Sequence, residues 1–596
     1  MQEPVDRFCD HVCVPRPLRL RSIARAIAVI CVLLIAWVGW QVWQVKSDLE
    51  AAKSAASVVR DAVDARDLET ARAAVQDLGV RSNDARERTD GMTWSALTHL
   101  PVFGDDAHAV RVLSDVLDDL AAQVADPLLD IAYDLDNGAM SPQRGRIPIE
   151  EIGRIQTPVE AGRSAVARSE QAVAGLSGSY VQQIDDARQQ VSEALETAAG
   201  PLRRLATATR LLPSVLGGDG PRRYLLVLQN NAEIRSTGGF PGSAFLLKVD
   251  DGLVQLTHPE AGQAFPHLDT PALPLSSAER TLFSERAGTW FVDANTIPSF
   301  ARSADLWTAH WERRFGGRLD GVVATDPVTL SYVLEATGPV EVDGVELTHE
   351  NATAELLSGT YARLTDPEAQ DAFFRRAGSK IFGAVTHVDD AAGLLRALQR
   401  SADEQRLLFS SVHPDEEREV TRTALAGVDR PAPADVPRVG VFVSDTTGTT
   451  GSKLSYYLRY QAKVVSTGCG RGRQELTGTA ALQLKTPEAP DDLPLYVTGG
   501  DPAVPVGDED LYILLVGPKA GSLNDVRQDG RPVRSRVVDY EGRPATRVEL
   551  RLPAGGATEL TWRMVASAEQ TGDVQVDVTP SVVPGSTSSV AVSSCR

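Results

Sequence analysis

The segment Gln229–Ser243, QNNAEIRSTGGFPGS, gathers polar side chains and a cation between two apolar runs. Arg235 stays charged, and its guanidinium group can donate paired hydrogen bonds to phosphate oxygens. Glycine lets a bulky anion approach the backbone closely. The sequence therefore predicts an anion site on this loop, formed by Asn231, Arg235, Ser236, Thr237, Gly238 and Gly239. In the alternative interpretation, Arg235 ties the loop to a neighbouring acid such as Glu233.

A second group of cations follows on a helix expected to begin after Asp366-Pro367. Arg376 and Lys380 are four residues apart and so share one helical face, with Arg375 beside them. Apolar residues occupy much of the remaining circumference, which predicts a largely buried helix whose cations face a groove or a partner acid. A solvated face is the alternative. Two arginine groups that met in space could together hold a pyrophosphate.

Other familiar catalytic or metal-binding motifs lack support. The sequence contains no H-E-x-x-H and no G-x-S-x-G. Gly448–Lys453 resembles a phosphate loop superficially, but its spacing is wrong, and we interpret it as a turn between strands. Cys9, His11 and Cys13 lie close together but lack the fourth ligand that a zinc site needs.

Length and charge restrict the class of protein. A chain of 596 residues is too long for one hydrophobic core and predicts about three domains. Its formal charge of -20 argues against nucleic acid as a partner, because binding a phosphate backbone needs a basic face. Any anionic ligand must therefore be held by a local cluster of cations.

Residues 26–45 form an uncharged apolar run, long enough to cross a bilayer as a helix. The run follows directly on Arg16, Arg19, Arg21 and Arg25, so we expect a cytoplasmic N-terminus and an extracytoplasmic location for the rest of the chain. Trp37, Trp40 and Trp43 collect at the outer end, where indole rings favour the interface. We interpret the run as an uncleaved signal anchor in the cell membrane. A cleaved signal peptide is the alternative.

The cysteines agree with that topology. Only Cys469 and Cys595 lie beyond the predicted tail and span. In an oxidising compartment we expect a disulfide between them, and closing so long a loop would contribute about 4–5 kcal/mol on the chain-entropy model.

Hydrophobic periodicity divides the chain. Helices are expected at 110–124, Ser47–Leu78 and Pro158–Leu212. Beyond Arg222 the period changes, and strands are expected at Tyr224–Gln229, Ser243–Val249, Leu253–Thr257 and Gly321–Thr325. The predicted fold is multidomain, with a cytoplasmic tail (1–25), a single transmembrane helix (26–45), a membrane-proximal helical bundle (46–215), a central α/β domain (216–430) and a C-terminal β-sandwich (438–596).

Four segments resemble the bacterial membrane family catalogued as domain of unknown function family 4012. They are Gln229–Ser243, Leu319–Gly344 (LDGVVATDPVTLSYVLEATGPVEVDG), Thr348–Tyr361 (THENATAELLSGTY) and Thr93–Leu113 (TWSALTHLPVFGDDAHAVRVL). The order of elements is also distantly similar to the LytR-CpsA-Psr phosphotransferases. Those single-span proteins move phosphorylated glycans from polyprenyl pyrophosphate onto cell-wall polymers.

The distant resemblance implies roles for individual residues. Arg235-Ser236 matches the first two positions of an Arg-Ser-Asp strand that holds the pyrophosphate, whereas Thr237 replaces the acid that helps to bind Mg²⁺. Gln370, Arg375 and Arg376 match a later Arg- and Gln-rich helix loosely.

Two functions follow as alternatives. In the first, the chain is a membrane-anchored envelope protein that binds a phosphorylated or lipid-linked glycan. The fuller form of this hypothesis makes it a phosphotransferase that attaches the glycan to a cell-wall polymer. Arg235 with Arg375 or Arg376 would then neutralise the transferring phosphoryl group. Asp293 and Asp326 would serve as base or Mg²⁺ ligand. In the second, the chain is a non-enzymatic scaffold for envelope or surface-polysaccharide assembly. A transporter subunit is disfavoured, because one span forms no pathway alone.

Overall fold

The computed structural model describes residues 18–595 apart from 101–102, 144, 180, 448–450, 488–489 and 587, and it describes side chains from residue 36 onward except at 64 and 491. These residues form two compact units. The first comprises the described residues up to Tyr133 together with Thr157–Ala206, and the second comprises Asp134–Gln156 and those from Thr207 onward. The prediction of a multidomain chain with helices and several sheets is confirmed.

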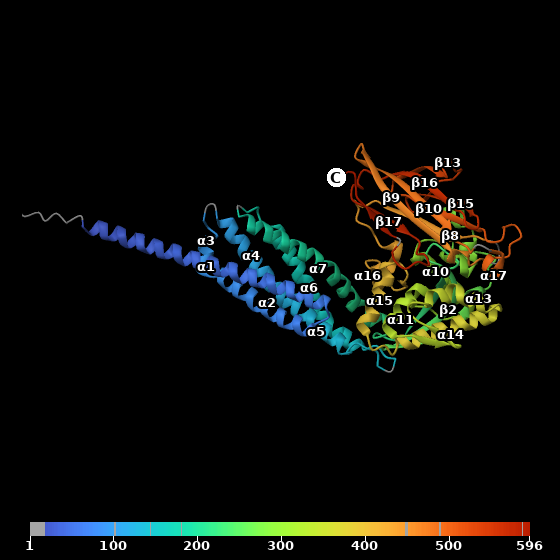
Figure 1. Ribbon diagram of the computed structural model, residues 1–596, viewed down its shortest axis with the longest axis horizontal. Coiled ribbons are helices and arrows are strands. Elements are labelled where there is room, and N and C mark those ends of the chain that lie inside the picture. Colours follow the sequence, from blue (N-terminus) through green and yellow to red (C-terminus); the bar gives the residue numbers. More distant parts are fainter. Residues whose placement is uncertain are drawn as a thin grey trace, which may run out of the picture. The chain divides into compact units, whose positions relative to one another are not determined.

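The first unit is helical (Figure 1). Its core contains Leu113, Val116 and Val124 packed with Val166 and Leu195, as the predicted stripe over 110–124 requires. Its elements are α1 (Leu18–Asp64), α2 (Leu68–Thr89), α3 (Met92–Leu97), α4 (Gly104–Leu120), a π-helical turn η1 (Ala121–Ala125), α5 (Asp126–Asp136), and parts of α6 (Ile149–Ala174) and α7 (Gln182–Val215).

Two predicted helices are wrong in extent. The helix expected over Ser47–Leu78 is interrupted, because Arg66 adopts a left-handed backbone (φ 59°) and the Asp67 carboxylate caps α2 by accepting the Thr70 N–H at 3.0 Å. The helix expected over Pro158–Leu212 ends at Ala174, before a segment that contains Gly175 and Gly178.

The predicted transmembrane helix coincides with part of α1. The side chains of residues 26–35 lie outside the described part of the chain, as do residues 1–17, which include Cys9, His11 and Cys13. Among the described residues, no helix is both long and apolar enough to span a bilayer. The membrane anchor therefore stays a prediction.

The second unit begins with a five-stranded sheet in the order β3-β2-β1-β4-β7. β1 and β4 are parallel, and the other neighbours are antiparallel. The four predicted strands are therefore confirmed. The strands are β1 (Arg222–Asn230), β2 (Phe240–Asp250), β3 (Leu253–Ala261), β4 (Gly321–Thr325) and β7 (Leu408–Ser411).

Helices cover both faces of this sheet. Leu225 and Val227 of β1 share a core with Trp307 and Trp311 of α10 (Phe300–Phe315). Leu228 points to the opposite face, because side chains alternate along a strand, and there it approaches Gly378 of α14 (Pro367–Val385). α14 packs with α11 (Pro327–Thr337) and α15 (Ala391–Asp403). The remaining helical and short strand elements of this region are η2 (Gly262–Ala264), α8 (Ser277–Phe283), α9 (Arg286–Thr289), η3 (Phe291–Thr296), β5 (Val340–Val342), β6 (Val345–Leu347), α12 (Ala352–Ala354), η4 (Glu355–Gly359), α13 (Thr360–Arg363), α16 (Pro414–Val420) and η5 (Ala424–Asp429).

The C-terminal region forms two sheets around one core. One sheet has the order β13-β12-β16-β10-β9 and the other β14-β15-β11-β8-β17-β18. The strands are β8 (Arg438–Asp445), β9 (Leu458–Gly470), β10 (Arg473–Leu484), β11 (Glu509–Val516), β12 (Ser522–Gln528), β13 (Arg531–Pro532), β14 (Val538–Tyr540), β15 (Arg543–Leu552), β16 (Ala557–Val565), β17 (Val574–Val578) and β18 (Ser589–Ala591). Cys469 and Cys595 form the expected disulfide, with their Cα atoms 5.1 Å apart.

The six-stranded sheet is buried on both faces where it meets the α/β region. Along β8 every residue is buried. Val441 and Val443 face the sandwich core, whereas Phe442 faces the opposite way, into a core shared with Phe291 and Trp307. Figure 1 shows β8 and α10 close together, with β9 and β10 further from the helices. The α/β region and the β-sandwich therefore form one continuous body.

Candidate functional site

The loop between β1 and β2 lies inside the protein. All nine residues from Asn231 to Gly239 are buried, although most of them are polar. Most of their polar groups are paired, many of them with η3: Asn295 Nδ2 donates to Gln229 Oε1 at 2.8 Å and to the Gly239 carbonyl at 2.8 Å, and Thr237 Oγ1 donates to Gln229 Oε1 at 2.7 Å. Asn231 Oδ1 and Arg235 Nε are buried without a hydrogen-bond partner among the described residues. Gly239 is required sterically, because a Cβ there would lie 2.3 Å from the Asn230 carbonyl carbon.

Arg235 is held by carboxylates and carbonyls. Its Nη2 lies 3.2 Å from Glu233 Oε1 and 3.9 Å from Asp293 Oδ1. Its Nη1 donates to the carbonyls of Ile234 (3.0 Å) and Asp445 (3.1 Å), which joins the loop to β8. Burial alone would lower the pKa of Arg235, but attraction to Glu233 and Asp293 outweighs it and raises the pKa. The interpretation that Arg235 ties the loop to Glu233 is confirmed.

Glu233 has a second buried partner that the sequence did not suggest. Lys453 Nζ donates to Glu233 Oε2 and lies 4.9 Å from the ring centre of Tyr496 and 5.7 Å from those of Phe240 and Tyr361. Burial opposes the charge on Lys453, yet the Glu233 carboxylate raises the pKa of this lysine. The pair bridges the β1–β2 loop and the segment before β9.

Two further acids complete this buried charged cluster. Burial raises the pKa of Asp445 to about 6, against the opposing attraction of Arg235. Burial and the neighbouring Asp445 also raise the pKa of Glu509 well above its ordinary value. One oxygen of Glu509, Oε2, has no hydrogen-bond partner. Like charges in a low-dielectric interior favour the protonated form of at least one member.

A wide pocket of about 720 Å³ opens beside Arg235. Arg286 forms part of its wall: Nε lies 2.8 Å from Asp293 Oδ2, and the guanidinium group sits 4.5 Å above the Trp290 ring. On another side, Arg547 lies 4.1 Å above the Tyr512 ring. The charged lining residues are Arg235, Arg286, Arg547, Glu233, Asp293 and Asp445, and the aromatic ones are Phe240, Phe265, His267, Phe283, Trp290, Phe291, Tyr496 and Tyr512.

A narrow pocket of about 100 Å³ lies between the sheet and α14. The larger part of its wall surface is apolar, and the polar side chains that line it are Gln229, Asn230, Ser243, Gln263, Asp326, Tyr361, Asp371, Lys453 and Tyr496. Burial raises the pKa of Asp371, and the charges of Arg375 and Lys453 oppose this effect. The apolar lining consists of Leu228, Phe240, Ala261, Pro327, Leu330, Leu356, Pro367, Phe374, Ala377 and Gly378. The narrow and wide pockets adjoin, since Phe240, Gln263 and Tyr496 line both.

The cations of α14 point elsewhere. Arg376 is exposed and holds Asp343 through Nε at 2.9 Å. Arg375 is half-buried and Lys380 is exposed, and neither lines either pocket. Gln370 is buried and donates to the Leu364 carbonyl at 2.7 Å. Within the described residues, no contact joins Arg235 to Arg375 or Arg376, so the structure does not bring together the two cationic groups that a shared pyrophosphate site would need.

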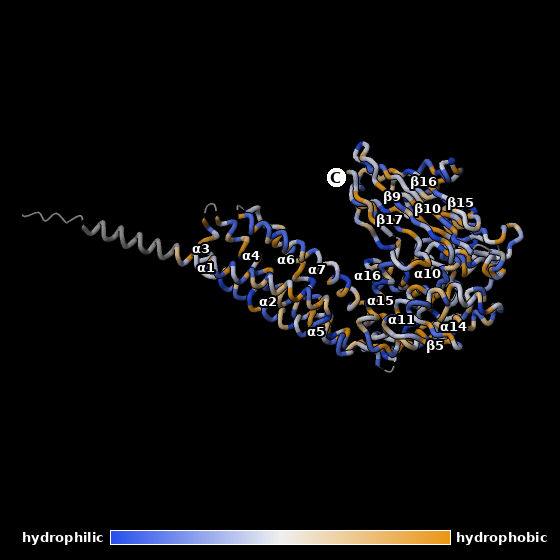
Figure 2. Tube along the Cα trace, in the orientation of Figure 1, coloured by the Kyte–Doolittle hydropathy of each residue, from blue (hydrophilic) through white to orange (hydrophobic). Residues whose placement is uncertain are grey.

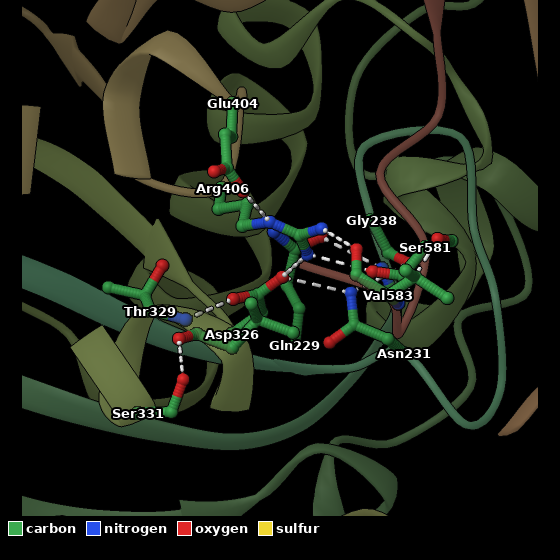
Figure 3. A network of polar contacts seen from close by, with 12 residues as sticks. Gln229, Asn231, Gly238, Asp326, Thr329, Ser331, Glu404, Arg406, Ser581 and Val583 are labelled. Atoms are coloured by element: carbon green, nitrogen blue, oxygen red, sulfur yellow. Dashed lines mark hydrogen bonds and ion pairs between the residues drawn. The ribbon is translucent and has the colours of Figure 1, made fainter. Parts of the chain in front are cut away.

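Asp326 belongs to a separate network around Arg406 (Figure 3). Its Oδ2 accepts from Arg406 Nη1 at 2.8 Å and from Asn231 Nδ2 at 3.0 Å, and its Oδ1 caps α11 by accepting the Thr329 N–H at 2.8 Å. Arg406 also reaches the Ser581 and Val583 carbonyls and Glu404. Asp326 is therefore committed to structural contacts.

The two predicted metal ligands have different neighbours. Asp293 pairs with Arg286 and Arg235, whereas Asp326 pairs with Arg406. Across the described ranges, no three His, Cys, Asp or Glu side chains cluster as a metal site requires. A magnesium site at Asp293 and Asp326 stays a prediction.

The observed architecture is an α/β domain and a β-sandwich joined by a common core, with two adjoining pockets at their buried loop. Residues 219–361 match the family described as protein of unknown function (DUF4012). The family predicted from the motifs is thereby confirmed, although Thr93–Leu113 falls outside the match. A comparison with curated proteins gives no match.

Proposed function

We propose that this chain is a membrane-anchored, extracytoplasmic envelope protein that binds a lipid-linked glycan across the two pockets. The observation that carries this proposal is the junction between a narrow, mainly apolar pocket and a wide, aromatic and charged one, which share Phe240, Gln263 and Tyr496. A ligand with a hydrocarbon chain at one end and a sugar at the other matches this division.

The wide pocket suits a sugar better than a bare phosphate. Its lining holds three guanidinium groups and three carboxylates, so its formal charges balance. Sugar hydroxyls can donate to carboxylates and accept from guanidinium groups, and the apolar faces of sugar rings can stack on Trp290 or Tyr512. A phosphate that links the sugar to the hydrocarbon chain of the ligand could bind Arg286, whose side chain is 50% exposed.

The narrow pocket suits hydrocarbon. Leu228, Leu330 and Phe374 supply apolar walls from β1, α11 and α14. Each methylene group that moves from water into such a site contributes about 0.8 kcal/mol. Even a short part of a prenyl chain would therefore contribute measurably to affinity.

Sequence features support the envelope location. The uncharged run at 26–45 is long enough to span a bilayer, and the arginines that precede it favour a cytoplasmic N-terminus. The disulfide between Cys469 and Cys595 suits an oxidising compartment. Phosphotransfer is left out of the proposal, because Arg235 is committed to Glu233 and Asp445 and does not meet Arg375 or Arg376.

Binding should be measured by calorimetry with a short-chain prenyl-pyrophosphate-linked sugar, alongside the sugar pyrophosphate without its prenyl chain. Ala261→Phe should fill the narrow pocket. Excluding about two methylene groups at about 0.8 kcal/mol each would weaken the lipid-linked ligand about tenfold. The same variant should leave binding of the chain-free sugar unchanged.

Two further variants make the test specific. Trp290→Ala removes an aromatic wall of the wide pocket, so it should weaken both ligands. Ala264→Phe makes the same change as Ala261→Phe at an exposed position outside both pockets, so it should weaken neither. Absence of binding by the unaltered protein would refute the proposal and favour a scaffold. Equal losses in Ala261→Phe and Ala264→Phe would refute the assignment to the narrow pocket.

A further inference from the structure

An uncharged segment stands out in the helical unit. Gly91–Gly104, GMTWSALTHLPVFG, contains no Asp, Glu, Lys or Arg, although Asp90 and Asp105 flank it directly. The segment comprises α3 and the start of α4. Such a gap in a strongly charged chain is typical of a surface that does not face bulk water alone.

The apolar side chains of this segment are held outward. Met92 is 92% exposed, Phe103 is 61% exposed and Leu100 is 47% exposed. They do not fold back into the unit, because the buried Trp94 fixes α3 to α4 by donating from Nε1 to the Ala107 carbonyl at 2.8 Å. We call Met92, Leu100 and Phe103 the α3 foot.

The α3 foot follows the end of α2 that contacts α1 next to its tryptophans. Arg88 Nε pairs with Asp48 Oδ2 at 2.8 Å, and Arg88 also contacts Gln44. These contacts place the C-terminal end of α2 beside the residues of α1 that follow Trp43, and Met92 begins α3 three residues after α2 ends. Trp37, Trp40 and Trp43 are 48%, 46% and 64% exposed. In Figure 1, α3 lies at the end of the helical unit nearest the start of α1, where it contacts α2 and α4, and Figure 2 shows hydrophilic and hydrophobic residues mixed along the described part of α1.

We propose that the α3 foot inserts into the outer leaflet of the membrane beside α1. This inference rests on the membrane anchor of the proposed function and adds a second point of attachment to it. Lipid is the occupant that fits, because the foot follows a helix end whose Arg88 contacts Gln44 in the uncharged run at 26–45, next to indole rings of the kind that favour the bilayer interface. Asp90 and Asp105 give no attraction to anionic headgroups, so insertion depends on apolar burial.

The test uses the full chain in phospholipid nanodiscs, with Cys9, Cys13 and Cys31 replaced by serine and an environment-sensitive fluorophore attached at Met92→Cys or Phe103→Cys. The matched control is Val63→Cys, an exposed valine at the far end of α1. Spin-labelled lipids should quench the fluorophore at 92 and 103 from a depth of about 5–10 Å, typical of interfacial segments, and should leave position 63 unquenched. Emission at 92 and 103 should also shift to shorter wavelength.

The remaining outcomes separate the two proposals. If the chain enters nanodiscs but fluorophores at 92 and 103 behave like that at 63, the α3 foot is refuted and the anchor stands. If the chain does not enter nanodiscs, the anchor and the foot both fail. If the shift of emission to shorter wavelength at position 103 occurs only when one disc holds two chains, the foot binds a second copy of the chain. The lipid proposal is then refuted.

Discussion

At the scale of single residues, the charges around Glu233 decide how the β1–β2 loop is held. Lys453 and Arg235 both pair with this buried carboxylate. Removing one partner of a buried ion pair destabilises the folded protein, because the other charge stays buried without an opposite charge. We therefore expect Lys453→Met to lower the free energy of unfolding by about 3–5 kcal/mol, measured by urea denaturation.

Two comparison variants identify the cause of that loss. Lys248→Met makes the same substitution at an exposed position of β2 and should change stability by less than about 0.5 kcal/mol. Adding Glu233→Gln to Lys453→Met should recover part of the loss, since no anionic partner then remains unpaired. A loss in Lys453→Met no larger than in Lys248→Met would contradict the account of this pair.

Asp445 should make stability depend on pH. Its pKa is raised from 3.8 to about 6, so between these values the folded protein binds more protons than the unfolded chain. Stability from this group is complete below the unfolded pKa and is lost as pH rises through about 6. Relative to the unaltered protein, Asp445→Asn should therefore lose less stability between about pH 4 and about pH 7 in chemical denaturation. Parallel pH profiles for the two proteins would contradict this.

The sequence correctly predicted that the polar residues between β1 and β2 form a specialised loop. It did not predict which residues from other parts of the chain contact that loop. Asn231, Thr237 and Gly239 do form a specialised turn. The partners of Arg235 come from Asp293 and from Asp445, more than 50 residues away, and no local pattern reveals such contacts. Lys453 was missed because a lysine in a turn is usually solvated, and only tertiary packing buries it.

At the scale of elements, patterns of apolar residues along the chain were the reliable ones. Apolar runs bounded by turn residues predicted the strands beginning at Tyr224 and Ser243, and the stripe from Val110 to Val124 predicted α4. The break at Arg66 was not predicted, because the helical pattern of the sequence continues through Asp67, the residue that caps α2. β8 was missed, although its unbroken run of buried residues is typical of a strand covered on both faces.

The disulfide is the element whose removal has the simplest consequence. Cys469 at the end of β9 is joined to Cys595 across 126 residues. Replacing both cysteines by serine should destabilise the protein by about 2–5 kcal/mol, the upper end being the chain-entropy value, seen as a lower midpoint of thermal unfolding under non-reducing conditions. A reductant should lower the midpoint of the unaltered protein and leave the variant unchanged. No difference between the two proteins would contradict a stabilising role for this bond.

At the scale of the whole molecule, the β-sandwich completes the core of the α/β region. Phe442, Tyr512 and Leu514 pack in the same cluster as Phe291 and Trp307. The sequence could not predict this, because the Pro-rich segment at 430–437 suggests a linker between independent domains. A chain that ends at residue 430 should therefore bind a hydrophobic dye and unfold without cooperativity. Cooperative unfolding near the midpoint of the full chain would contradict a shared core.

The proposal that a lipid-linked glycan occupies the two pockets is tested most directly by photo-crosslinking. A prenyl-pyrophosphate-linked sugar with a photoreactive group on its prenyl chain would be irradiated with the full chain, and the labelled peptides identified by mass spectrometry. The account predicts labels in Pro367–Val385 and Phe240–Asp250, which line the narrow pocket, with labelling suppressed in Ala261→Phe but retained in Ala264→Phe. Labels confined to the helical unit or to the outer strands of the sandwich would contradict it.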